Sequence, residues 1–487
     1  MKKSRKTQPA ARRGRSTSRS RVRSVLPLDR REDDPIKYVI VLMLENRSFD
    51  HFLGAMPKVN GVKPGAPNSN YERPGSPKSY PQTPDAVRKM SPDPHHETKN
   101  VLRQIDGAEL GPMGGFVYDF TLEEPHAQGA WPQVMSYFAD GALPALHALA
   151  KAFCICDPWF SSVPGPTWTN RFFAHSGTSQ GWVTMPSPPL HPNLHKYDQT
   201  TLYDRLNEKN IPWRIYAGDV PQSLVLSHQR QGANRKRYSA LGNFYHDLVT
   251  TSPQDFPAFT FIEPAYLPFG QNDQHPPHDV LKGDDLIASV YNALRASGEI
   301  WNGSLLIITW DEHGGFYDHV DPPAAVPPDH NTQEGFGFDR YGVRVPAILV
   351  SRWVKPASVF APRVGVLDHT SILRYVTDRY ELGPLGNRTA SAASFADAIA
   401  SAPDDHSPLG IGAEPRPIAM TQITAEPVPT LNKNQAALID FTKQLEVESG
   451  APPADVGVRA IRARSGLDGE VEVAKERVRL YLSQPSS

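Results

Sequence analysis

The strongest constraint on the fold is an almost unbroken apolar run at residues 36–44 (IKYVIVLML), which stops abruptly at polar residues. Runs of this kind are typical of strands buried on both faces in a parallel sheet. Helical spacing at 142–153 and 284–296 alternates with further apolar runs. The other predicted strands are residues 212–216, 259–262, 305–310 and 345–350. Helix followed by buried strand predicts an α/β fold, with a mostly parallel central sheet flanked by helices on both faces.

Composition divides the chain into four parts. The expected parts are a basic arm at 1–34, a main domain at 35–400, a proline-rich linker at 401–430 and a short helical tail at 431–487. Proline accounts for 48 of 487 residues, which argues against a helical bundle and for long loops. The tail holds two amphipathic segments that are too short to be stable alone, so they either dock on the main domain or fray.

Charge is balanced overall, with 51 basic and 52 acidic side chains, but it is unevenly placed. Residues 1–31 carry 12 Lys and Arg against one acid, a net charge of +11, so the rest of the chain carries −12. An acidic body is a poor surface for nucleic acid, because phosphate contact requires clustered cations, and no specific nucleic-acid partner is expected. The arm suits peripheral contact with anionic membranes, with a solvated tail as the alternative.

The basic arm resembles the start of a signal peptide in charge, but serines interleave with its arginines where an apolar core would run. No apolar stretch approaches the length of a membrane span, so no transmembrane segment is expected. The expectation is a soluble protein, cytoplasmic by default, with secretion and peripheral membrane attachment left open.

Two of the strongest predicted strands end in acidic clusters. Residues 36–44 lead into Glu45 and Asn46, and 305–310 lead into Asp311 and Glu312. In parallel α/β sheets, ligands bind beyond the carboxyl ends of the strands. Crowded carboxylates repel one another unless a cation neutralises them, and an all-oxygen set suits a hard divalent metal. The pattern therefore predicts a divalent metal site, with helix-capping acids as the alternative.

Two hydroxyls are candidate nucleophiles. The turn Gly165-Pro166 exposes Thr167, with Asn170 three residues later, and a hydroxyl beside a divalent cation loses its proton more easily. The alternative is Ser179, because residues 177–181 (GTSQG) fit the nucleophile elbow of serine hydrolases. An elbow requires a buried strand just before it, and 170–176 (NRFFAHS) is not such a run. Asp368-His369 downstream would have to complete that triad.

The 17 histidines are concentrated near these motifs. Histidines beside oxygen-rich strand ends indicate phosphate binding and general acid work, although each one alone is more typical of a structural hydrogen bond. Those in motif-like positions are His51, His95, His96, His275, His278, His313, His319 and His369.

Five segments in order carry a resemblance to a known family. They are 45–54 (ENRSFDHFLG), 165–171 (GPTWTNR), 272–279 (NDQHPPHD), 291–294 (YNAL) and 311–319 (DEHGGFYDH). Over roughly residues 36–400 the chain resembles the phosphoesterase family of bacterial phospholipases C, plant non-specific phospholipases C and acid phosphatases. The resemblance implies an alkaline phosphatase-like fold and hydrolysis of phosphoesters through a covalent phospho-enzyme.

The same resemblance implies roles for individual residues. Thr167 would be the nucleophile and would hold the metal together with Glu45, Asn46, Asp311 and Glu312. The metal could be Ca, Mg, Zn or Fe. The remaining catalytic candidates are His96, Asn170, His275, His319 and His369, with His275 favoured as the acid that protonates the leaving oxygen.

These inferences predict a phospholipase C-type phosphodiesterase that releases diacylglycerol and a phosphorylated headgroup through a phospho-threonine. Three alternatives remain open at this stage. The first is an acid phosphatase acting on monoesters, the second a serine esterase using Ser179, and the third a phospholipid-binding protein without turnover.

Overall fold

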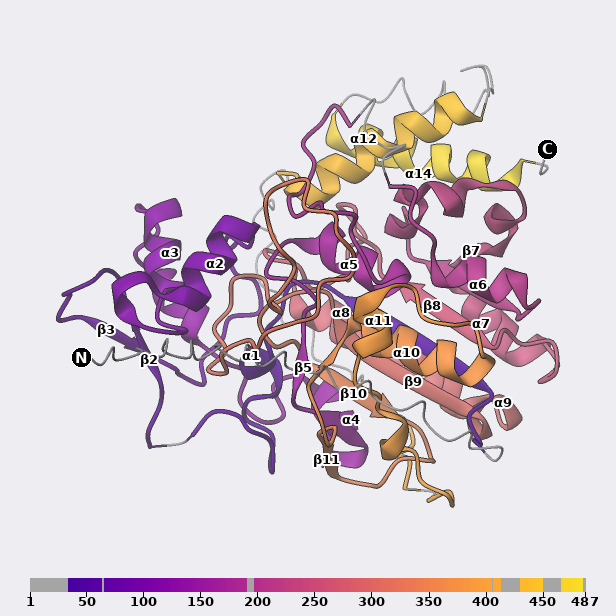
Figure 1. Ribbon diagram of the computed structural model, residues 1–487, viewed down its shortest axis with the longest axis horizontal. Helices are drawn as coiled ribbons and strands as arrows, with labels where there is room; N and C mark the ends of the chain where they lie inside the picture. Colours follow the sequence, from indigo (N-terminus) through magenta and orange to yellow (C-terminus); the bar gives the residue numbers. More distant parts are fainter. Residues whose placement is uncertain are drawn as a thin grey trace, which may run out of the picture.

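A computed structural model describes residues 34–63, 65–190, 197–404, 406–412, 430–449 and 466–484. Its centre is an eight-stranded sheet that crosses the molecule diagonally (Figure 1). In spatial order the strands are β11 (Ser358–Phe360), β4 (Cys154–Cys156), β10 (Ala347–Val350), β9 (Ser304–Trp310), β1 (Tyr38–Leu44), β8 (Phe259–Glu263), β6 (Trp213–Ala217) and β7 (Tyr238–Ala240). The arrangement confirms the predicted α/β class.

The central strands are parallel and buried along their whole length. β1 pairs with β8 on one side and β9 on the other, and Leu44 lies opposite Trp310 at the end of the β1–β9 pair. Because these ends are in register, the polar residues that follow both strands emerge at one edge of the sheet. β10 is the exception, since it runs antiparallel to both β9 and β4.

Helices form two groups that cover the two faces of the sheet. One group comprises α5 (Thr167–Ser176), α6 (Leu202–Glu208), α10 (His369–Tyr380) and α11 (Asn387–Ser391), with α10 and α11 in front of the sheet in Figure 1. The other comprises α4 (Pro144–Ala152), α7 (Leu241–Thr250), α8 (Val280–Ala296) and α9 (Glu299–Asn302).

The start of α8 differs from the sequence-based expectation. The helix begins at Val280 and is capped by Asp279, not at Asp284. The side chain of Asp284 instead accepts hydrogen bonds from the backbone N–H groups of Ala145 and Leu146, at the start of α4. An acid inside one helix thus caps another, which the sequence pattern does not show, because the two helices meet only in the folded chain.

A smaller lobe lies at one end of the sheet, on the left of Figure 1. It holds β2 (Ser69–Tyr71), β3 (Ser79–Pro81), α2 (Thr98–Asp106) and α3 (Phe116–Glu123), and has its own apolar core. The other short elements are α1 (Phe49–Leu53), β5 (Trp159–Phe160), β12 (Leu367–Asp368), and the 3₁₀ turns η1 (Ala108–Leu110), η2 (Trp131–Met135), η4 (Gln222–Val225), η5 (Ser227–Arg230), η6 (Gly232–Arg237) and η7 (Ala396–Ala398).

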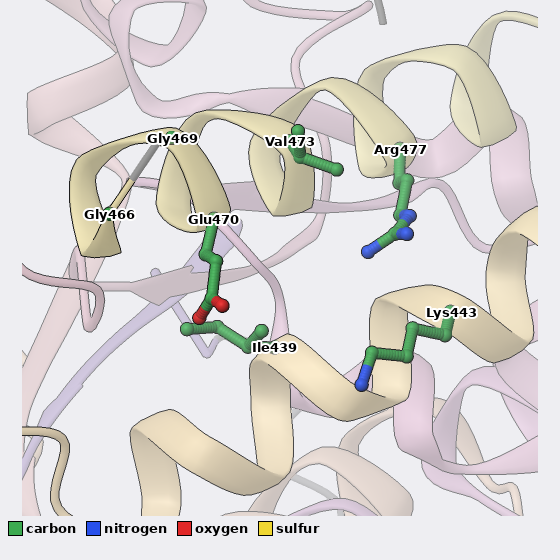
Figure 2. Close-up of a pocket in the computed structure, with 7 residues that line it drawn as sticks. All are labelled: Ile439, Lys443, Gly466, Gly469, Glu470, Val473 and Arg477. Carbon is green, nitrogen blue, oxygen red and sulfur yellow. The ribbon is translucent and has the colours of Figure 1, made fainter. Parts of the chain in front are cut away.

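The tail forms two helices that pack against each other, α12 (Lys433–Glu448) and α14 (Leu467–Ser483). Their buried apolar residues join the main core, so these segments dock rather than fray. A cavity of about 380 Å³ lies between them, lined by Ile439, Lys443, Gly466, Gly469, Glu470, Val473 and Arg477 (Figure 2).

The predicted basic arm at 1–34 lies almost wholly outside the described residues, as does most of the predicted linker. Within the described part of the chain, no helix has the length and apolar character needed to cross a bilayer.

Candidate active site

The residues that follow β1 and β9 form one connected group at the edge of the sheet. Asn46 adopts a left-handed backbone conformation, with φ of 62°, and its N–H donates to Asp311 Oδ1 at 3.1 Å. The same oxygen accepts the N–H of Glu312 at 2.7 Å. We refer to Glu45, Asn46, Asp311 and Glu312 as the strand-end group. The structure thus brings together four of the five residues that the sequence analysis named as metal ligands, the fifth being Thr167.

Two oxygens of the strand-end group are buried without a hydrogen-bond partner, Asn46 Oδ1 and Glu312 Oε1. Leaving a buried acceptor unsatisfied costs about 1–3 kcal/mol, so such atoms call for a missing partner. Burial also raises the pKa of Asp311 to about 7 and raises that of Glu45, because too little positive charge opposes it. Burial also acts on Glu312, but His96, whose Nε2 lies 3.8 Å from Glu312 Oε1, and His313 outweigh it and lower the pKa of that carboxyl. Buried oxygens that lack hydrogen-bond donors, beside two carboxyls with raised pKa values, fit a site for a divalent cation.

Arg171 connects this group to helix α5. Its Nε donates to Asp311 Oδ2 at 3.1 Å, and its Nη2 lies 3.5 Å from Glu45 Oε1. Because Arg171 stands one turn after Thr167, these contacts hold the amino end of α5 beside the strand-end group. Sequence reasoning placed no role on Arg171, although its helical spacing from Thr167 was a usable signal.

Thr167 is the first residue of α5 and is buried. The side chain of Asn170 holds the turn before it, since its Nδ2 donates to the carbonyls of Gly165 and Val163 and its Oδ1 accepts the Val163 N–H. Asn170 is therefore engaged in positioning Thr167. A helix amino terminus stabilises negative charge, which suits a hydroxyl that attacks a phosphate.

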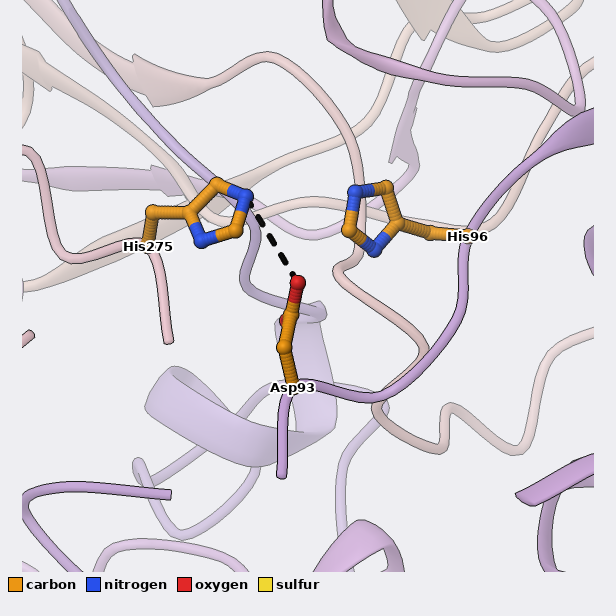
Figure 3. Close-up of side chains that lie close together, drawn as sticks. All are labelled: Asp93, His96 and His275. Atoms are coloured by element: carbon orange, nitrogen blue, oxygen red, sulfur yellow. Dashed lines mark ion pairs between the residues drawn. The ribbon is translucent and has the colours of Figure 1, made fainter. Parts of the chain in front are cut away.

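Two histidines and an acid converge beside Asn46 of the strand-end group (Figure 3). The Nδ1 atoms of His96 and His275 lie 2.8 and 2.5 Å from the carbonyls of Pro94 and Pro276. Hydrogen bonds there leave each Nε2 free to face the site. His275 Nε2 lies 3.8 Å from Asp93 Oδ2, and His96 Nε2 lies 3.1 Å from Asn46 Nδ2. Asp93, which the sequence analysis did not single out, completes this cluster.

The two rings have opposite electrostatics. Burial lowers the pKa of His275 well below its usual value, and the neighbouring His96 and His278 lower it further. Burial also disfavours the charged form of His96, but Glu312 and Asp93 outweigh that effect and raise its pKa to about 9. Asp93, His96 and His275 each offer a ligand atom close enough to the others to hold a metal ion. Protonation of the two histidines would compete with binding of such an ion.

Two further predicted histidines lie in different surroundings. His369 Nε2 lies 2.6 Å from the carbonyl oxygen of Asp311, and burial lowers its pKa to about 4. It thus supports the backbone of the strand-end group. His319 contacts Asp50, Asn60 and Arg344, none of which belongs to the site.

The serine-hydrolase alternative is not supported by the local structure. Ser179 follows helix α5 and not a strand, so the elbow geometry is absent. Its hydroxyl donates to the carbonyl of Trp182 at 2.6 Å. Asp368 accepts from Ser162 and Thr370, and among the described residues no hydrogen bond or ion pair joins Asp368 or His369 to Ser179.

Glu45 has two partners that the sequence analysis missed. Gln222 Nε2 donates to its Oε1 at 2.6 Å, and Asn434 Nδ2 donates to the same oxygen at 3.0 Å. Gln222 comes from η4 and Asn434 from the tail helix α12, both far from Glu45 in sequence.

None of the predicted site residues lines the cavity between α12 and α14, where Lys443 is paired with Asp440 and Arg477 with Glu446.

Known proteins match this chain over most of its length. The phosphoesterase family model matches residues 36–383. The chain is 38% identical over 395 residues to non-specific phospholipase C6 of Arabidopsis thaliana, covering 75% of this chain and 72% of that relative. It is 27% identical over 406 residues to phospholipase C B of Mycobacterium tuberculosis, covering 73% and 75%. A solved protein in the alkaline phosphatase superfamily from Vibrio parahaemolyticus aligns with a TM-score of 0.33 and 10% identity, over 73% and 69% of the two chains.

Proposed function

Because the chain belongs to the phosphoesterase family and is a phosphoric ester hydrolase, we propose that it is a phospholipase C-type phosphodiesterase. The observation that carries the proposal is the convergence at one edge of the sheet. There Arg171, one turn after Thr167 on α5, contacts Asp311 and Glu45 of the strand-end group, which holds buried oxygens without hydrogen-bond partners. A phosphate group is bound in such a place by a helix terminus and a cation together.

Glu45, Asn46, Thr167, Asp311 and Glu312 are the residues proposed to hold a divalent cation. When bound, the cation would favour the ionised hydroxyl of Thr167 and neutralise charge on the phosphoryl oxygens. The unpartnered Asn46 Oδ1 and Glu312 Oε1 support this assignment, since oxygen ligands suit a hard divalent ion. Ca, Mg, Zn and Fe are all compatible with it.

In the proposed reaction, Thr167 Oγ1 loses its proton to water, attacks the phosphorus and forms a new P–O bond. The bond between phosphorus and the diacylglycerol oxygen breaks, and that oxygen takes a proton from Nε2 of His275. The headgroup phosphate remains on Thr167 until water displaces it, and the proton from water returns to His275. Burial, with His96 and His278 nearby, lowers the pKa of His275, so the neutral ring must take up a proton from solvent before it can act as the acid. Asp93 Oδ2 lies 3.8 Å from this Nε2, where it can pair with the protonated ring.

The remaining residues act by positioning. Arg171 ties the start of α5 to Asp311 and Glu45, while Asn170 shapes the turn that presents Thr167. His96 bonds Asn46 and faces the same space, so we assign it to contact with phosphoryl oxygens. His369 supports the Asp311 backbone, and His319 lies outside this group of contacts.

The products of one assay separate the candidate functions. Full-length protein is incubated with phosphatidylcholine vesicles and, separately, with p-nitrophenyl phosphate, with and without a chelator. The proposal expects phosphocholine and diacylglycerol, and a loss of both on chelation. Inorganic phosphate from the monoester without phosphocholine would instead establish an acid phosphatase. Vesicle binding without any product would indicate a binding protein.

We also propose that the basic arm contacts anionic membrane surfaces. The support is its net charge of +11 over residues 1–31, which lie outside the described residues. Each cation near an anionic bilayer contributes about 1 kcal/mol, and salt screens the attraction. Deleting 1–31 should leave turnover of a soluble short-chain diester unchanged but weaken binding to anionic vesicles at low salt. Unchanged vesicle binding at every ionic strength would refute this role.

A further inference from the structure

Glu45 depends on a residue from the far end of the chain. Asn434, near the start of α12, is buried, and its Nδ2 donates to Glu45 at 3.0 Å for Oε1 and 3.3 Å for Oε2. The family match ends at residue 383, so this contact comes from outside the matched region. A site built from the strand ends of the main domain therefore includes a side chain supplied by the tail.

The orientation of the Asn434 amide is fixed by its other neighbour. Trp168 Nε1 donates to Asn434 Oδ1 at 2.9 Å, and an indole nitrogen can only donate. The amide oxygen must therefore face Trp168, which leaves the NH₂ group to face Glu45. Because Trp168 directly follows Thr167, one amide joins the nucleophile's neighbour to a proposed metal ligand.

Glu45 needs this donor because of where it lies. Its carboxylate is fully buried, and Arg171 Nη2 lies 3.5 Å from its Oε1. Two amide donors, from Gln222 and Asn434, compensate for the loss of water around it. A carboxylate whose orientation and charge are set by such donors binds a cation better than a loosely held one, and losing such a partner typically weakens metal affinity about 10–100-fold.

Helix α12 is anchored so that Asn434 stays in place. The adjacent Gln435 donates to the carbonyl of Tyr266 at 2.7 Å and lies 3.2 Å from His278 Nε2. Farther along, Asp440 accepts the N–H of Leu190, and Glu448 pairs with Arg230. The helix is thus fixed to the loops around the site at several points.

From these contacts we infer that Asn434 is a positioning residue for the metal site, acting through Glu45. The inference rests on the proposed function, because it concerns the cation assigned there. It predicts that the tail helix contributes to metal affinity, although it supplies no ligand of its own.

The test is a Mn²⁺ titration of chelator-stripped, full-length protein, with the free ion measured by electron paramagnetic resonance. Asn434→Ala and the similar-sized Asn434→Leu should bind Mn²⁺ about 10–100-fold more weakly than wild type. Saturating Mn²⁺ should restore most of kcat in both variants, because the ligands themselves remain. Thr442→Val is the matched control, since Thr442 is buried in the same helix and its hydroxyl donates only to the Ile439 carbonyl.

Equal dissociation constants for wild type and both Asn434 variants would overturn the positioning role and leave the proposed function standing. An equal weakening by Thr442→Val would also overturn it, because the effect would then reflect α12 packing in general. A wild-type protein that binds no Mn²⁺ would count against the proposed metal site itself.

Discussion

Two groups of buried acids arise from the same two segments of the chain, and they differ in what surrounds them. The strand-end group, defined above, comes first in each segment. A few residues later come Asp50 and Asp318, which together with His319 we call the clamp group. The acids of both groups are buried, and the clamp group has ligand atoms close enough to hold a metal. Residue type and burial alone therefore do not distinguish them.

The partners of the oxygens make the distinction. In the clamp group, Arg344 donates to both oxygens of Asp318 and to Asp50 Oδ1, at 2.8 to 3.1 Å. Asp50 Oδ2 accepts from Gln82 at 3.0 Å. In the strand-end group, Asn46 Oδ1 and Glu312 Oε1 have no such partner. The comparison indicates that the clamp group is satisfied within the protein, and it supports the proposal that a ligand completes the strand-end group.

The largest effect is expected at the nucleophile beside the strand-end group. Thr167→Ala should lower kcat/KM by several orders of magnitude, because it removes the atom that forms the bond to phosphorus. Ser179→Ala is the control and should stay within about tenfold of wild type, ~1.4 kcal/mol of barrier. Steady-state rates on a soluble phosphodiester measure both. The reverse ranking would contradict the phosphoesterase assignment.

A large loss of stability, with little direct effect on chemistry, is expected in the clamp group. Arg344→Leu leaves Asp50 and Asp318 buried without their cation and should lower the free energy of unfolding by about 3–5 kcal/mol. The nearby Arg340 pairs with the exposed Asp106 and Asp321, so Arg340→Leu should cost about 1 kcal/mol or less. Urea unfolding compares the two. If both variants lost a similarly small free energy of unfolding, the clamp group would not be a major source of stability.

A smaller loss of stability, which depends on pH, is expected at a buried histidine outside both groups. Burial lowers the pKa of His175, on α5, to about 3. The unfolded chain then binds a proton near pH 6.5 that the folded chain does not, so stability falls as pH drops below that value. Between pH 7 and pH 5 wild type should lose about 2 kcal/mol from this residue.

Urea unfolding at the two pH values, on wild type and His175→Gln, measures that loss. The variant should lack this part of the pH dependence. An identical pH dependence in both proteins would assign the loss of stability at low pH to groups other than His175.

Much of the fold could be predicted because local pattern determines it. The apolar runs that became β1 and β9 are buried on both faces, and their in-register ends had to place Glu45, Asn46, Asp311 and Glu312 at one edge. Alternating helices and strands imply a parallel sheet, and a parallel sheet places the carboxyl ends of these strands at the same edge.

What could not be predicted depends on contacts between distant parts of the chain. Nothing near Asn434 in the sequence indicates that its amide reaches Glu45, because docking of α12 brings the two together. Likewise, the sequence does not show that Arg344 donates hydrogen bonds to Asp50 and Asp318, or that His319 contacts Asp50. Acids that look equivalent in the sequence therefore differ in role, because tertiary packing gives them different hydrogen-bond partners.

Metal content tests the difference between the two groups most directly. Full-length wild type, Glu312→Gln and Asp318→Asn are purified identically, checked for folding by circular dichroism, and analysed for bound metal by elemental analysis. We expect metal in wild type and in folded Asp318→Asn, and its loss from Glu312→Gln. Metal retained by Glu312→Gln and lost from Asp318→Asn would contradict the account, as would a fully active wild type that contains none.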